Sequence, residues 1–369
     1  MTESAGAEAA PKSTRFLRPE RVKEATLLAI IAVSVLVFAF LIEGYLSGRF
    51  FNRVTTSVVV VTLLAAAQAL VIFSRNIDLS VGAIVGVAAY LTGDFLAATG
   101  QGPITAVLVA IVVGAVLGSV NGLLVAYGGV PAIIVTLGTL ALFRTLLSIY
   151  SEGANVLAGD LPSWVLEFNN VTLFTIAGFQ MRLVFLIAVF VVAGLQFALA
   201  RLRWGRRIYA IGSNPSAAAQ AGLPTASLVF WSFVGSGALA GLAGFMFLAR
   251  AGTISATAGA GLELESVAAA VVGGVSILGG SGTMVGAFLG AVFIDTLKLS
   301  LVRVPEVSEF WRDAFLGILI LAAVILDTVL RNRFNRRWSA EARKAMESTG
   351  PSAVGMARMA GGGGGTADA

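Results

Sequence analysis

The chain lacks cysteine and histidine entirely, and only 12% of its 369 residues are charged. Without these two residue types, disulfides, thiol chemistry, zinc or haem held by His or Cys, and His-based catalytic triads are excluded. Soluble domains carry about a quarter charged residues, so the low charge also argues against a soluble fold. We expect no metal site, no cofactor and no catalytic residue in this chain.

Long apolar runs are what the sequence has instead: 57% of its residues are hydrophobic and its mean hydropathy is +0.90. Many runs approach the ~20 residues that cross a bilayer as a helix. The sequence therefore predicts an all-α integral membrane protein with about ten transmembrane helices, including broken or half helices. We expect them near residues 25–47, 54–74, 79–99, 103–126, 132–151, 182–200, 226–250, 264–278, 283–302 and 313–330.

The basic residues predict the orientation, because cytoplasmic loops are enriched in Lys and Arg. They cluster before residue 25, at 201–207 and after residue 330, and ten crossings would place all three clusters on one face. We therefore expect both termini in the cytoplasm, and we attribute the basic excess to topology and membrane lipid, not to nucleic acid. The expected divisions are a cytoplasmic segment 1–24, a transmembrane domain 25–330 with a cytoplasmic loop 201–225, and a basic, then disordered, cytoplasmic tail 331–369.

Glycines occur inside and between the predicted spans, where small residues let membrane helices approach closely. The run 271–290 differs, because the pairs Gly273-Gly274 and Gly279-Gly280 bracket a short apolar segment. This pattern predicts a helix that breaks at membrane depth, which is tolerated where the backbone is packed in protein or lines a wet cavity. The run lacks the lysine of a phosphate-binding loop, so we expect no ATP site.

Isolated polar residues mark two further places in the apolar sequence. Asp78 follows Arg75 and precedes Ser80, so it is either an N-cap with an ion pair to Arg75 or part of a transport pathway. Thr136 and Thr139 share one helix face, and they could either contribute to helix packing or line a transport path.

The other acids predict no transport or catalytic cluster. Asp94, Asp295 and Asp327 lie near predicted span ends or alone, and Glu263 and Glu265 are expected as surface acids in a loop.

The stretch from Asn214 to Gly222 predicts a short helix on the cytoplasmic side. Asn214 is a good N-cap, Pro215 suits the first helical position, and Gly222 is a typical C-terminal stop. A helix of this length is marginal by itself, so we expect another protein to support it.

Four segments in this order resemble the permease family of bacterial ABC sugar importers of the ribose, xylose and galactoside type. They cover most of residues 55–330 and are NIDLSVGAIVG (76–86), NGLLVAYGGVPAIIVTLGTLALFR (121–144), GRRIYAIGSNPSAAAQAGLP (205–224) and AAAVVGGVSILGGSGTMVGAFLGA (268–291). Residues 301–327 further resemble the rhamnose and autoinducer-2 branch.

The resemblance implies a transmembrane subunit that works by alternating access with two ATP-binding cassette subunits. It also implies a second permease, identical or related, and a periplasmic or lipid-anchored sugar-binding protein. A short helix of the 201–225 loop would couple to the ATPase through Gly212, Asn214, Pro215, Ala217, Ala218, Gln220 and Gly222. The translocation path or gate would use Asp78, Ser80, Asn121, Thr136, Thr139, Gly273, Gly274, Gly279 and Gly280. Residues 216–220 read Ser-Ala-Ala-Ala-Gln where relatives often carry a Glu and an Arg, so alanine packing would replace an ion pair.

Three alternatives remain at this stage. The cargo could be autoinducer 2 instead of a monosaccharide. A secondary sugar transporter would share broken helices but needs a coupling acid deep in a span. A membrane enzyme without His or Cys would depend on paired carboxylates.

Overall fold

A computed structural model describes residues 19–304 except Ala177, together with residues 311, 314, 317, 318, 321, 322 and 325. The chain divides into units of residues 1–320 and 321–369. The described residues of the second unit, Leu321, Ala322 and Ile325, are helical. The described elements of the first unit are α1 (Pro19–Leu41), α2 (Gly48–Phe73), α3 (Val81–Thr99), α4 (Pro103–Ala126), α5 (Ala132–Ser151), α6 (Ser163–Asn170), β1 (Thr172–Ile176), β2 (Phe179–Arg182), α7 (Leu183–Arg201), α8 (Arg203–Ser213), α9 (Pro215–Gln220), α10 (Thr225–Ala251), α11 (Leu262–Val272) and α12 (Met284–Leu301).

Eight described helices are long and apolar enough to span a membrane: α1 from Arg21 onward, α2, α3, α4, α5, α7, α10 and α12. They confirm eight of the predicted spans. The eighth segment in the predicted order, 264–278, is the 11-residue helix α11, a half helix that ends at Val272. In the predicted tenth, 313–330, residues 314, 317, 318, 321, 322 and 325 are helical and the others lie outside the described residues.

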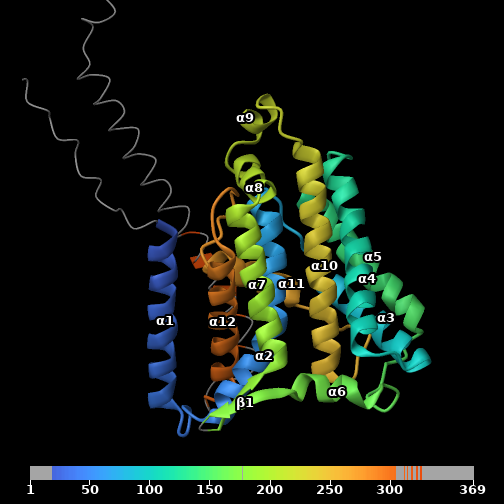
Figure 1. The fold of residues 1–369 in the computed structure, drawn as a ribbon, viewed down its shortest axis with the longest axis vertical. Coiled ribbons are helices and arrows are strands. Elements are labelled where there is room, and N and C mark those ends of the chain that lie inside the picture. The colour runs from blue at the N-terminus through green and yellow to red at the C-terminus, as the bar shows by residue number, and fades with distance from the viewer. Residues whose placement is uncertain are drawn as a thin grey trace, which may run out of the picture. The chain divides into compact units, whose positions relative to one another are not determined.

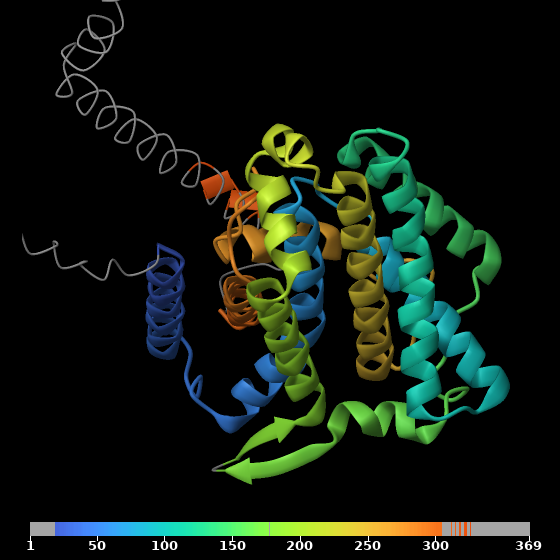
Figure 2. The same cartoon turned by 45° about the horizontal axis from the view of Figure 1, so that its top comes forward.

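Helix α2 is the centre of the first unit. In an 18-residue apolar stretch of α2, 94% of the residues are buried. Helices α10, α12, α11 and α7 pack around α2 (Figures 1 and 2). Helices α8 and α9 lie at one end of the bundle, and β1 and α6 lie at the other. A helix buried on all sides needs apolar residues all round, and α2 has them from Val58 to Phe73 apart from Thr62 and Gln68.

The outer helices keep apolar side chains exposed, as expected of surfaces that face lipid. Phe40 of α1 is 91% exposed, Ile104 of α4 79% and Phe190 of α7 72%. In water such surfaces would associate, whereas hydrocarbon tails solvate them as well as protein does.

Small residues bring α4 and α10 into backbone contact, as the glycine spacing predicts. A Cβ placed on Gly114 would lie 2.1 Å from the Gly237 carbonyl oxygen, and one on Gly118 would lie 2.4 Å from that of Phe233. The backbones approach this closely only because no side chain separates them.

Residues 152–181, which separate two of the expected spans, contain helix α6 and an antiparallel hairpin of β1 and β2. Asn52 of α2 fixes the hairpin: its side-chain nitrogen donates to Gly178 O at 3.0 Å, and its oxygen accepts from Gln180 N at 2.7 Å. The β-branched Thr172, Thr175 and Ile176, with Gly178 soon after them, are the sequence signals that could have predicted the hairpin.

The basic 201–207 stretch is not an open loop, because α7 ends at Arg201 and α8 begins at Arg203. Ile208 and Ile211 are buried against the bundle, whereas Arg206 and Arg207 are exposed. Ile208 and Ile211 are three residues apart, and this apolar spacing could have predicted an amphipathic helix.

Candidate functional site

The short helix predicted after Asn214 is present as α9, with the predicted caps. Asn214 Oδ1 accepts hydrogen bonds from Ala217 N at 3.0 Å and from Ser216 Oγ at 2.8 Å. Gly222 has a φ of +73°, the left-handed conformation that ends many helices. The local structure was therefore predictable from the residues themselves.

The seven predicted coupling residues divide into an inner and an outer set. Gly212 and Ala218 are buried against the bundle, with Ala218 only 5% exposed. The outer set is exposed and comprises Asn214, Pro215, Ala217, Gln220 and Gly222. Helix α9 thus rests partly on its own chain through Ala218, and its outer residues form a free surface at the end of the first unit.

Helix α8 connects this surface to the glycine-rich segment 273–282. Tyr209 Oη donates to Gly282 O at 2.9 Å, and Ser213 Oγ donates to Gly280 O at 3.3 Å. The Tyr209 ring also lies 4.7 Å, centre to centre, from that of Phe73 at the end of α2. A movement of α8 would therefore act directly on the glycine segment and on α2.

The glycine segment packs as closely as its sequence suggests. Gly280 N donates to Phe73 O at 3.1 Å, and Gly279 and Gly280 have φ of +79° and +70°. A Cβ on Gly279 would lie 2.3 Å from Cγ of Arg75. The predicted break is confirmed: α11 ends before Gly273 and α12 begins after Thr283. Gly274 also has a positive φ, +87°.

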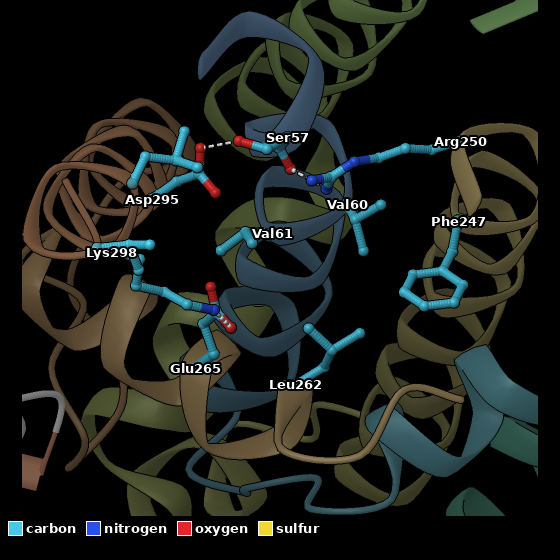
Figure 3. A pocket seen from close by; sticks show the side chains of 11 residues that line it. Ser57, Val60, Val61, Phe247, Arg250, Leu262, Glu265, Asp295 and Lys298 are labelled. Atoms are coloured by element: carbon cyan, nitrogen blue, oxygen red, sulfur yellow. Dashed lines mark hydrogen bonds and ion pairs between the residues drawn. The ribbon is translucent and has the colours of Figure 1, made fainter. Parts of the chain in front are cut away.

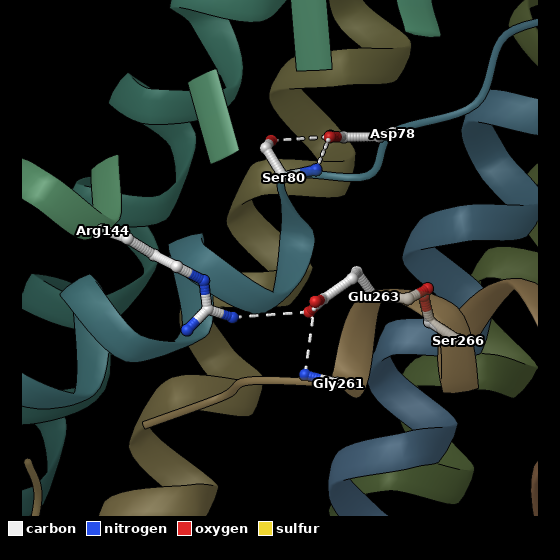
Figure 4. Close-up of polar contacts among 6 residues, drawn as sticks. All are labelled: Asp78, Ser80, Arg144, Gly261, Glu263 and Ser266. Atoms are coloured by element: carbon white, nitrogen blue, oxygen red, sulfur yellow. Dashed lines mark hydrogen bonds and ion pairs between the residues drawn. The ribbon is translucent and has the colours of Figure 1, made fainter. Parts of the chain in front are cut away.

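A chain of buried hydrogen bonds joins four of the predicted path residues. Thr139 Oγ1 donates to Asn121 Oδ1 at 2.7 Å, and Asn121 Nδ2 donates to Ser80 Oγ at 2.7 Å. Ser80 Oγ in turn donates to Asp78 Oδ1 at 2.6 Å (Figure 4). The chain ties α5 and α4 to the segment between α2 and α3. Thr136 is not part of this chain: its hydroxyl donates to Ala132 O of its own helix at 2.8 Å and lies 3.4 Å from Ile77 O, next to Asp78.

Asp78 is not the N-cap of α3, which was one of its two expected roles. Helix α3 begins at Val81 with Ser80 as its N-cap, and Asp78 Oδ1 accepts from Ser80 N at 2.9 Å. The expected ion pair with Arg75 is absent from the ion pairs of the described residues. Asp78 is fully buried, and its Oδ2 makes no hydrogen bond of good geometry among the described residues, although the Ser236 side chain lies nearby. An unsatisfied buried carboxylate oxygen is costly, which marks this position as a functional candidate.

The expectation of loop acids at Glu263 and Glu265 is wrong. Both lie in the first turn of α11; Glu263 pairs with Arg144 at 3.5 Å, and Glu265 is buried and pairs with Lys298 at 2.5 Å. Figure 4 shows Glu263 between Arg144 and Gly261 N, which donates to its Oε1 at 3.2 Å. Carboxylates at this site also place negative charge at a helix N-terminus, which stabilises the helix.

Asp295 does not lie alone either, because Ser57 Oγ of α2 donates to its Oδ2. Of the other acids, Asp94 is exposed and accepts from Tyr150 Oη at 2.7 Å, and Asp327 lies outside the described residues. Sequence spacing could not bring Ser57, Glu265 and Asp295 together, since they belong to three different helices.

Comparison with known proteins finds one matching family and similar import permeases. Residues 50–324 match the family described as the branched-chain amino acid transport system / permease component. The autoinducer 2 import system permease protein LsrC of Escherichia coli O9:H4 (strain HS) is 36% identical over 312 residues, 84% of this chain and 88% of that protein. The protein of that name from Yersinia pestis (strain Pestoides F) is 35% identical over 319 residues, 86% of this chain and 87% of that one. No solved structure matches the chain.

Proposed function

The chain belongs to the family of branched-chain amino acid transport system permease components, and we propose that it is the transmembrane subunit of an ATP-driven ABC importer for a sugar-like solute. The observation that carries this proposal is 36% identity to an autoinducer 2 import permease across 84% of the chain. The cargo is a monosaccharide or a related small polyol-like solute, such as rhamnose or a ribose-type sugar. Autoinducer 2 is the second candidate, which the names of the relatives favour.

The proposed complex lies in the bacterial inner membrane, with both termini of this chain in the cytoplasm. It contains two ATPase subunits, on which ATP hydrolysis takes place, and a second permease that is either a copy or a relative. A periplasmic or lipid-anchored binding protein delivers the cargo. The basic exposed residues of α8, Arg203, Arg206 and Arg207, support a cytoplasmic position for α8 and α9.

In this mechanism the outer surface of α9 docks on an ATPase subunit and moves with it. Helix α8 passes the movement to Gly280 and Gly282 through the contacts of Ser213 and Tyr209. Gly279 packs closely against Arg75, which lies three residues before Asp78, so the movement is passed on to this segment. The hydrogen-bond chain from Asp78 to Thr139 then acts as a gate, because α4 and α5 separate from the segment between α2 and α3 only if it breaks.

The experiment is uptake of labelled rhamnose, ribose and autoinducer 2 into proteoliposomes that hold the complete complex. We expect one of them to accumulate only with ATP and with a catalytically competent ATPase subunit. Uptake that continues with an inactive ATPase and follows an ion gradient would show a secondary transporter instead.

The docking surface is tested by Ala217→Glu, since Ala217 is exposed on α9. We expect ATP hydrolysis to persist while uptake falls at least about tenfold, since a charge placed in a close interface costs more than 1.4 kcal/mol. Thr175→Glu is the matched control, because Thr175 is exposed in the hairpin at the opposite end. Equal uptake by both variants would show that α9 is not part of the interface with the ATPase.

A further inference from the structure

A cavity of about 200 Å³ lies between α2, α10, α11 and α12, apart from the residues of the proposed gate. It is polar on one side and apolar on the other, although it lies among membrane-spanning helices. Its polar side is lined by Ser57, Arg250, Glu265, Asp295 and Lys298 (Figure 3).

The polar side of the cavity holds two acids and two bases. Ser57 Oγ donates to Asp295 Oδ2, Arg250 Nη1 donates to Ser57 O at 3.5 Å, and Lys298 Nζ lies 2.5 Å from Glu265 Oε2. The charges balance, so the cavity attracts neither cations nor anions as a whole. It offers carboxylate acceptors beside guanidinium and ammonium donors.

These polar groups do not satisfy one another completely. Glu265 is 4% exposed, and its Oε1 has no hydrogen-bond partner among the described residues. Leaving a buried charged acceptor unpaired is more costly than leaving a neutral one unpaired. The oxygen therefore needs a donor, and the adjoining cavity is the place from which one can reach it.

The size and walls of the cavity define the kind of molecule that fits. At ~30 Å³ per water molecule, 200 Å³ holds roughly six waters or a polyol of about five or six carbons. Val60, Val61 and Phe247 supply an apolar wall for the carbon skeleton. A hydroxyl group both donates and accepts, so a neutral polyol can bond to both the acidic and the basic side chains without burying a new charge.

We propose that this cavity binds the transported solute, an uncharged polyhydroxylated molecule, at an intermediate stage of its passage. The site rests on the proposed importer function, and it adds Ser57, Arg250, Glu265, Asp295 and Lys298 as cargo-binding residues. Binding is weak, because a carrier must release its cargo and because the Lys298–Glu265 ion pair and the hydrogen bonds of Ser57 already engage most of the polar groups.

The absence of cysteine from the chain makes a direct test available. In the complete complex, Ser57→Cys is treated with a water-soluble methanethiosulfonate reagent, with and without the probe that the wild-type complex takes up. We expect modification, slowed at least threefold by saturating probe. Thr62→Cys is the control and should resist the reagent, because Thr62 is fully buried in α2 and is not among the cavity residues.

Two results would overturn the site: modification of Ser57→Cys no faster than that of Thr62→Cys, or modification that the probe leaves unchanged. If Ser57→Cys does not assemble, Val60→Cys replaces it, since Val60 also lines the cavity. The rate of cysteine modification reports directly on access to the cavity and does not depend on the transport rate.

A second variant separates the site from the function on which it rests. Asp295→Asn should raise the cargo concentration for half-maximal uptake by about tenfold, as for one lost hydrogen bond to a charged group, with the maximal rate less affected. If the wild type transports and this variant is unchanged, the site is wrong and the importer function stands. If the wild type takes up no probe under ATP, both proposals fail.

Discussion

Gly212 of α8 and Gly280 of the glycine segment meet without a side chain between them: a Cβ on Gly212 would lie 2.4 Å from Gly280 N. The same Cβ would lie 1.9 Å from Phe73 O, so three segments converge there. Real Cβ atoms do not approach backbone atoms this closely, and backbone cannot move aside as a flexible side chain can. The contact places the glycine segment and the end of α2 against α8.

Gly212→Ala should therefore separate α8 from both neighbours. Overpacking of this kind costs about 1–3 kcal/mol, so we expect a lower melting temperature and uptake reduced about tenfold, measured in the reconstituted complex. Gly194→Ala is the control, since nothing lies within 4 Å of a Cβ at Gly194 in α7. Wild-type uptake by Gly212→Ala would show that the contact is not needed for coupling.

The α4–α10 contact predicts a sharp difference between two glycine variants. A Cβ on Gly237 would lie 2.2 Å from Gly114 O, whereas nothing lies within 4 Å of one on Gly138, which is exposed in α5. Gly237→Ala should lower the free energy of unfolding by about 1–3 kcal/mol. Gly138→Ala should raise it by about 0.5–1 kcal/mol through helix propensity. Thermal unfolding in detergent measures both, and similar shifts would contradict the packing.

The buried hydrogen-bond chain makes Asn121 a sensitive position. Asn121→Leu removes one acceptor and one donor, and it leaves the hydroxyls of Thr139 and Ser80 without those bonds. Ser80 keeps its bond to Asp78 and Thr139 its longer bond to Thr136 O, but two buried hydrogen bonds are lost at about 0.5–1.5 kcal/mol each. We therefore expect a marked loss of stability in denaturant unfolding. Ser119→Ala, in the same helix, loses only a bond to Val116 O of its own helix and should change stability by less than about 0.5 kcal/mol.

The cap of α9 predicts a local effect. Asn214→Ala removes the acceptor for Ala217 N and should destabilise α9 by about 1 kcal/mol. Hydrogen exchange of the amide groups in 216–220 should become roughly fivefold faster, while that of α10 stays unchanged. Asn214→Asp should restore slow exchange, because aspartate is an equally good N-cap. Loss of protection that Asn214→Asp does not restore would assign another role to the asparagine.

The helices and their local ends follow from short-range properties of the sequence. Apolar length predicts the spans, and Asn214, Pro215 and Gly222 predict α9 together with its caps. The break between α11 and α12 is predictable for the same reason, since paired glycines disfavour a continuous helix. Helix α8 and the hairpin carry weaker signals: the spacing of Ile208 and Ile211 indicates α8, and the β-branched residues of 172–176 indicate the hairpin.

The membrane spans, the glycine-broken segment and the capped short helix depend on residues close together in the chain, so the sequence is enough to predict them. Which polar residues meet depends on how the helices pack. Asp78 and Ser80, from the segment between α2 and α3, meet Asn121 of α4 and Thr139 of α5. In the same way, Ser57 of α2 and Glu265 of α11 meet Asp295 and Lys298 of α12. The physical reason is that a buried polar group must find its partner across a helix interface, and helix packing, not sequence spacing, sets which groups lie across that interface.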